Sequence, residues 1–113
     1  AAIITSKIPK WEMKDDKPVL IENQESDTPI TTIPVSVTMG RIDDFIIADP
    51  NIDEWECLDA RITITTNSDG NIVALQKGGN NGFTLDQIVK CSEISISSGS
   101  KIREIIKQAT QSN

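Results

Sequence analysis

The stretches Pro34-Val-Ser-Val-Thr-Met-Gly40 and Arg61-Ile-Thr-Ile-Thr65 decide the fold, because apolar and polar residues alternate along both of them. Such alternation places the apolar side chains on one face of the chain and is typical of half-buried β-strands. A second apolar run follows each stretch after a short polar turn, first Phe45–Ala48 and then Ile72–Leu75. We therefore predict two hairpins that together form the central sheet.

Two helices are expected beside these hairpins. Asp49 is suited to cap a short helix over Pro50–Leu58, because proline is tolerated at the first helical position. A longer helix is expected to begin after Thr84, which forms a capping box with Gln87, since apolar residues then recur at steps of three and four. Gly99 lies in the middle of this helix, so either the helix packs closely there or it breaks.

The N-terminal third is expected to contain three pieces. Residues 1–6 have the character of a helix end whose beginning is missing, which indicates a fragment of a longer protein. Trp11–Ile21 is predicted to form a short hairpin, and the polar, acidic residues 22–32 are predicted to form a solvated loop. With the two central hairpins and the two helices, the pattern predicts one α+β domain with a four-stranded, mainly antiparallel sheet.

Length and charge limit the possible functions. The 113 residues are enough for one domain with a single core. The net charge is −6, and residues 12–59 hold thirteen acidic side chains against three basic ones. This surface repels a phosphate backbone, so the isolated chain is not expected to bind nucleic acid strongly.

The apolar residues and the cysteines indicate the compartment. No apolar run approaches the length of a transmembrane helix, and we expect no membrane partner. Cys57 and Cys91 show neither pairing nor metal-type spacing, so both are interpreted as small buried apolar residues. An intracellular, reducing compartment is therefore expected.

Five ordered segments resemble the second domain of ribonuclease-PH-like subunits of the RNA exosome, and together they extend over roughly residues 5–108. The segments are Ile33–Met39, Phe45–Pro50, Glu56–Ile64, Asp69–Gly79 and Phe83–Leu85. In that family the domain is a four-stranded sheet with helices packed on it, which agrees with the fold predicted above. The resemblance implies that residues 1–113 are one C-terminal-type ribonuclease PH domain of a longer, two-domain subunit.

The resemblance also bears on catalysis. Active members of the family carry out phosphorolysis, in which inorganic phosphate attacks the last phosphodiester of an RNA 3′ end and a nucleoside diphosphate leaves. They carry two aspartates six residues apart, and alignment from Asp49 places Trp55 and Arg61 at those positions. Neither side chain can replace a carboxylate as a proton donor or metal ligand. The resemblance therefore implies a non-catalytic subunit without catalytic residues, bound metal or cofactor.

The function implied by the resemblance is structural. The parent protein would be an RNA-path-forming ring subunit of the exosome, the complex that processes and degrades RNA from 3′ to 5′. Its partners would be other ribonuclease-PH-like subunits in a hexameric ring and RNA-binding cap subunits, with RNA bound only within the assembled complex. It would act in the nucleus, nucleolus and cytoplasm of a eukaryote, or in the cytoplasm of an archaeon. The phosphate-gripping residues and the first domain of the family would precede this chain.

Three residues are candidates for contact with a neighbouring subunit or with RNA: Trp55, Asp59 and Arg61. Trp55 is either a core aromatic residue or an anchor for a partner subunit, and an exposed position would favour the anchor. We prefer it to Phe45, which lies in a predicted strand. Arg61 either reaches an RNA phosphate at a subunit boundary or forms a structural ion pair beside Asp59.

Other functional classes are also compatible with this sequence. A metal-assisted hydrolase would use the acidic cluster Asp49, Asp53, Glu54, Glu56 and Asp59. The simpler interpretation is that these carboxylates cap a helix, pair with a neighbouring base or are solvated. An acidic protein-binding module unrelated to the exosome is a further alternative. The loop Gly78–Gly82 lacks the Lys-Ser/Thr of a phosphate-binding loop, and we interpret it as a connector.

Overall fold

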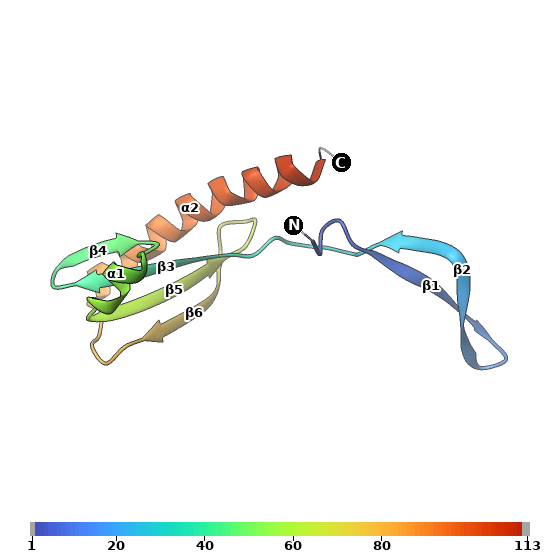
Figure 1. Ribbon diagram of the computed structural model, residues 1–113, viewed down its shortest axis with the longest axis horizontal. Coiled ribbons are helices and arrows are strands. Elements are labelled where there is room, and N and C mark those ends of the chain that lie inside the picture. Colours follow the sequence, from blue (N-terminus) through green and yellow to red (C-terminus); the bar gives the residue numbers. More distant parts are fainter. Residues whose placement is uncertain (1, 112–113) are drawn as a thin grey trace. The chain divides into compact units, whose positions relative to one another are not determined.

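The computed structural model describes residues 2–111, and the chain divides into two compact units (Figure 1). One unit is Thr32–Ile105, and the other comprises, of the described residues, 2–31 together with 106–111. Within residues 2–111, no helix is both long and apolar enough to cross a bilayer.

The unit Thr32–Ile105 is built on a four-stranded antiparallel sheet in the order β4-β3-β5-β6 (Figure 1). The helix α1 (Ile52–Glu56) connects β4 to β5, and the helix α2 (Leu85–Gln111) follows β6. This arrangement confirms the predicted α+β class and both central hairpins. The strands are β3 (Val35–Ile42), β4 (Phe45–Ala48), β5 (Ala60–Thr66) and β6 (Ile72–Gly78).

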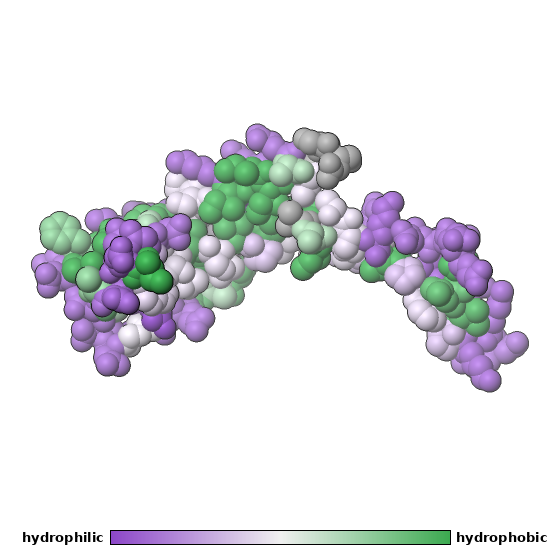
Figure 2. Space-filling view, in the orientation of Figure 1, coloured by the Kyte–Doolittle hydropathy of each residue, from purple (hydrophilic) through white to green (hydrophobic). Residues whose placement is uncertain are grey.

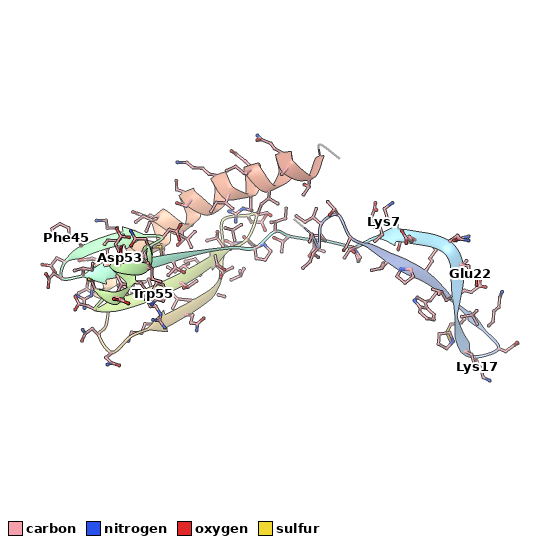
Figure 3. The ribbon with its side chains drawn as sticks, in the orientation of Figure 1. Lys7, Lys17, Glu22, Phe45, Asp53 and Trp55 are labelled. Carbon is pink, nitrogen blue, oxygen red and sulfur yellow. The ribbon has the colours of Figure 1, made fainter. Side chains whose placement is uncertain are left out.

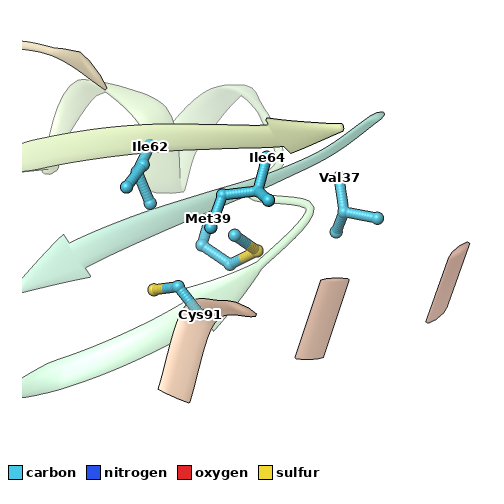
Figure 4. Close-up of a cluster of buried hydrophobic side chains, with 5 residues drawn as sticks. All are labelled: Val37, Met39, Ile62, Ile64 and Cys91. Carbon is cyan, nitrogen blue, oxygen red and sulfur yellow. The ribbon is translucent and has the colours of Figure 1, made fainter. Parts of the chain in front are cut away.

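The core lies between the two central strands and α2. Val37 and Met39 from β3 pack with Ile62 and Ile64 from β5 and with Cys91 from α2 (Figure 4). The intervening residues of both strands lie on the opposite face, as alternation requires. Their hydroxyl groups form a cross-strand ladder there, with Ser36 and Thr65 separated by 2.8 Å and Thr38 and Thr63 by 2.9 Å. The alternation in the sequence therefore becomes one apolar and one polar face.

The long helix α2 is capped as predicted and is not broken at its glycine. The Thr84 backbone N–H donates to Gln87 Oε1 at 2.9 Å, and the Gln87 N–H donates to Thr84 Oγ1 at 3.3 Å. A Cβ atom at Gly99 would lie 2.6 Å from Thr66 Oγ1. Gly99 thus permits close packing of α2 against the end of β5, where Arg103 also donates to the Thr66 carbonyl at 2.9 Å.

The N-terminal unit contains a longer hairpin than predicted. Strand β1 (Lys7–Lys14) pairs with β2 (Lys17–Asp27) through a tight turn in which Asp15 and Asp16 have positive φ angles of 49° and 60°. Two successive positive φ angles are typical of a two-residue type I′ hairpin turn. The predicted loop over residues 22–32 is wrong for residues 22–27, which lie in β2. Because neither face of these residues is buried, they lack the apolar alternation that indicates a strand.

The predicted helix end near the N-terminus is also wrong. Residues 2–5 form a turn, and Pro9 lies inside β1 rather than at the end of a helix. A hairpin strand has one edge without a partner strand, so a proline is tolerated there if its missing N–H would point outward. Residue 1 of the predicted helix end lies outside the described residues.

The two cysteines have different surroundings. Cys91 is buried in the core as expected, but Cys57 at the end of α1 is exposed, so the interpretation of both as buried residues is wrong for Cys57. Burial raises the pKa of the Cys91 thiol, and the nearby Lys90 lowers it by a smaller amount. Cys91 therefore stays protonated to a higher pH than an exposed thiol.

This difference predicts two rates of thiol modification. With a disulfide reagent at pH 8, Cys57 should react rapidly and Cys91 at least about tenfold more slowly, because access to Cys91 requires local opening of the core. Denaturant should make the two rates similar. The matched variant Cys57→Ser should remove the rapid phase alone. A rapid phase that persists in this variant would show that Cys91 is accessible in the folded chain.

Candidate interaction site

The segment between β4 and β5 carries the candidate site, and its helix is capped differently from the prediction. Asp49 is not the cap: it has a positive φ of 53° at the end of β4, and α1 begins at Ile52, later than predicted. Instead, the Asn51 side chain accepts from the backbone N–H groups of Asp53 at 3.0 Å and Glu54 at 2.9 Å. The Glu54 carboxylate in turn accepts from the Asn51 N–H at 2.8 Å, which completes a capping box.

Trp55 and Arg61 are brought together on the surface. The guanidinium carbon of Arg61 lies 4.7 Å from the centroid of the Trp55 ring, a cation–π contact worth about 0.5–1 kcal/mol at an exposed site. Arg61 is also the register partner of Gly78 in β6, and a Cβ atom there would lie 2.6 Å from Arg61 Nε. The arginine therefore lies against both the indole and the bare backbone of β6. Trp55 still exposes 42% of its surface.

The Asp59 carboxylate stabilises the turn between β3 and β4. Its Oδ2 accepts from the Asp43 N–H at 2.8 Å and lies 3.6 Å from a guanidinium nitrogen of Arg41. Arg41 donates to the Asp43 carbonyl at 2.6 Å, so the three residues form one linked group. Of the two alternatives for Arg61, the structural ion pair with Asp59 is not found. Asp59 pairs with Arg41 instead, and Arg61 lies over the Trp55 ring.

The acidic residues of this segment do not converge. Glu54 is used in the capping box of α1, and Asp59 is used in the turn described above. Within residues 2–111, no three Asp, Glu, Cys or His side chains are grouped so that they could hold a metal ion. The five carboxylates that lie close together along the sequence therefore do not form a metal-binding group in the folded structure.

Two further apolar residues at this end of the unit are more exposed than Trp55. Phe45 exposes 74% of its surface and Ile52 exposes 79%. Figure 3 shows Phe45, Asp53 and Trp55 at the same end of the unit. Phe45 lies in a strand as predicted, but this is the edge strand β4 and Phe45 is not part of the core cluster, so a strand position alone does not exclude it as an interface residue. A shallow, largely apolar hollow of about 300 Å³ adjoins α1 and is lined by Pro50, Asn51, Ile52 and Trp55.

Comparison with known sequences gives the family. Residues 32–98 match the 3′ exoribonuclease family, domain 2. The chain is 35% identical over 113 residues to the exosome complex component Rrp42 of Thermococcus gammatolerans, which covers 99% of this chain and 41% of that protein. It is 43% identical over 76 residues to Rrp42 of Thermoplasma volcanium, which covers 67% of this chain and 29% of that protein.

Comparison with solved structures agrees. An archaeal exosome core matches with a TM-score of 0.78 and 29% identity, covering 95% of this chain and 40% of that chain. The Archaeoglobus fulgidus exosome with RNA bound to the active site matches with a TM-score of 0.70 and 31% identity, covering 74% and 33%. The chain thus spans about two fifths of the length of these proteins or less. The expected ribonuclease PH domain 2-like fold is confirmed, and the chain belongs to the 3′ exoribonuclease family, in its domain 2.

Proposed function

We propose that this chain is the second domain of a ring subunit of an exosome, the complex that processes and degrades RNA from its 3′ end. The observation that carries the proposal is the agreement with an archaeal exosome core over 95% of the chain at a TM-score of 0.78. The relatives named as exosome component Rrp42 support the same assignment. Since the chain spans only 41% of the first of these relatives, the proposed parent protein also carries the first domain of the family.

The proposed role in the ring is structural. Phosphorolysis requires carboxylates near the leaving oxygen, and the positions that resemble the catalytic pair hold Trp55 and Arg61. Neither an indole nor a guanidinium can act as a carboxylate, and in this structure the two side chains contact each other. The partners proposed are other ribonuclease-PH-like subunits of a hexameric ring and RNA-binding cap subunits. RNA would be bound only within that assembly, because this chain carries a net charge of −6.

This role predicts that the parent subunit alone has no phosphorolytic activity. Incubated with single-stranded RNA, inorganic phosphate and Mg²⁺, it should release no nucleoside diphosphate above a no-protein control. An active phosphorolytic exonuclease on the same RNA provides the positive control. Release of nucleoside diphosphate would overturn the non-catalytic assignment. Release of nucleoside monophosphate that depends on Mg²⁺ and is lost on Asp59→Asn would indicate a metal-assisted hydrolase instead.

Within this proposal, Trp55 and Arg61 present a surface to a neighbouring subunit. Tryptophan and arginine are enriched among the residues that dominate binding energy at protein interfaces, and they act best near the centre of the contact. Here the two are stacked and exposed beside an apolar hollow. Asp59 supports this surface indirectly, because it fastens the neighbouring β3–β4 turn. Native mass spectrometry of the parent protein mixed with its ring partners tests whether a defined ring forms.

A further inference from the structure

The β1–β2 hairpin gathers apolar side chains on one face. Trp11 is the register partner of Leu20, and Met13 is the partner of Pro18. Directly opposed residues share a face and successive residues alternate, so these four side chains lie together. Figure 2 shows apolar surface within the hairpin, bordered by hydrophilic residues.

The other face near the turn is mostly polar. Glu12 is the partner of Val19, and Lys14 is the partner of Lys17. Glu12 and Lys14 form an ion pair with a nitrogen–oxygen distance of 2.7 Å on this face. The hairpin is therefore amphipathic, with one face suited to water and one suited to burial.

The side chains of the apolar face are exposed in the part of the chain that the structure describes. Every residue of β1 is exposed, including Trp11 at 59% and Met13 at 67%, and Leu20 on β2 exposes 45%. An isolated two-stranded hairpin is at best marginally stable in water, so its stability depends on packing against something else. A tryptophan and a methionine on the same open face are costly to leave in water.

We propose that this face docks onto the first domain of the parent protein, which this chain does not contain. The inference rests on the proposed two-domain subunit, since the matched family domain is the second one and the chain spans 41% of a Thermococcus relative. A domain that precedes the second one along the chain would be joined close to β1, which begins at Lys7. Such tethering gives an effective concentration in the millimolar range.

The size of the face favours this occupant over a separate protein. An independent partner usually needs a patch of about 800 Å² per side, formed by about 20–30 residues. The apolar face of the hairpin consists of four side chains. A contact of this size is sufficient when the partner is already held nearby by the chain, and it is small for an association between free subunits.

The tryptophan content of the chain allows a direct test in the full-length parent. The chain has two tryptophans, so Trp55→Phe leaves Trp11 as its reporter. Subtracting the emission spectrum of the Trp11→Phe/Trp55→Phe double variant removes the emission of any tryptophan in the first domain. For the dilute, unassembled subunit, we expect Trp11 to emit at shorter wavelength than N-acetyl-tryptophanamide. Iodide should quench the Trp11 emission several-fold less than it quenches N-acetyl-tryptophanamide.

A pair of variants gives a second readout that does not depend on fluorescence. Met13→Ser on the apolar face should lower the thermal midpoint of the full-length subunit. Lys14→Ser, its neighbour on the polar face, should leave the midpoint nearly unchanged. Equal effects of the two variants would contradict a one-sided docked face.

The remaining outcomes separate this inference from the proposed function. Trp11 that is quenched like the free reference in the full-length subunit, and shielded only after ring partners are added, would overturn domain docking while leaving the ring assignment intact. Shielding that grows with protein concentration would indicate a second copy and would also overturn it. Shielded Trp11 in a subunit that joins no ring would retain the docking and overturn the proposed function.

Discussion

Ile64→Ala is expected to lower the free energy of unfolding by about 2–5 kcal/mol. Ile64 lies in the central strand β5, is fully buried and packs in the cluster that contains Met39 and Cys91. Shortening it removes apolar contacts and leaves a cavity between the sheet and α2, where the packed surroundings relax only in part. Because small domains are stable by about 5–15 kcal/mol in total, the loss would be a large fraction of the whole. Urea unfolding of the variant and the unchanged protein, followed by circular dichroism, measures this change in the free energy of unfolding.

The neighbouring residue provides the matched control. Thr65 lies on the opposite face of the same strand, where its hydroxyl is 2.8 Å from that of Ser36. Thr65→Ala removes one exposed hydrogen bond, so it should cost about 1 kcal/mol or less. If Thr65→Ala proved more damaging than Ile64→Ala, the assignment of the two faces of β5 would be wrong.

The central sheet is predictable from the sequence because its two inner strands each have one face in the core and one face outside it. Burial then forces apolar side chains to alternate with polar ones, as Val37 and Met39 do with Ser36 and Thr38. The β1–β2 hairpin lacks this constraint, since neither face is buried within this chain. The polar second half of β2, residues 22–27, therefore has the composition of a loop.

The details of the site depend on pairings that are distant in sequence. Arg61 contacts Trp55 only because α1 ends beside β5. Its side chain can lie against the backbone of β6 because its register partner there is Gly78, which has no side chain. Asp59 reaches Arg41 because β3 and β5 are paired with Arg41 opposite Ala60. The family pattern singles out these residues, but the contacts between them require the three-dimensional register.

The exposure of Phe45 has the same origin. Nothing local marks β4 as an edge strand, since all four of its residues are apolar. Only the strand order β4-β3-β5-β6 places it at the edge of the sheet. Phe45 is therefore a second exposed aromatic residue at this end of the unit, and it competes with Trp55 for the role of interface anchor.

Trp55→Ala in the full-length parent is expected to weaken ring assembly by more than about 1 kcal/mol, a rise of about fivefold or more in the dissociation constant. The domain itself should stay folded, because Trp55 is not part of the core cluster and its contact with Arg61 is worth only about 0.5–1 kcal/mol. Titration of the variant with its ring partners, followed by native mass spectrometry, measures assembly. The thermal midpoint of the unassembled subunit measures folding.

Phe45→Ala is the matched control, because it also removes an exposed aromatic ring from the same end of the unit. Interface energy is concentrated in a few residues that become fully desolvated, so the two variants should differ if Trp55 is the anchor. If Phe45→Ala weakened ring assembly more than Trp55→Ala, the interface anchor would be Phe45 in the β3–β4 hairpin. A Trp55→Ala variant that unfolds would make the residue structural. One that folds and assembles normally would exclude both roles and leave the Trp55–Arg61 contact as a surface feature.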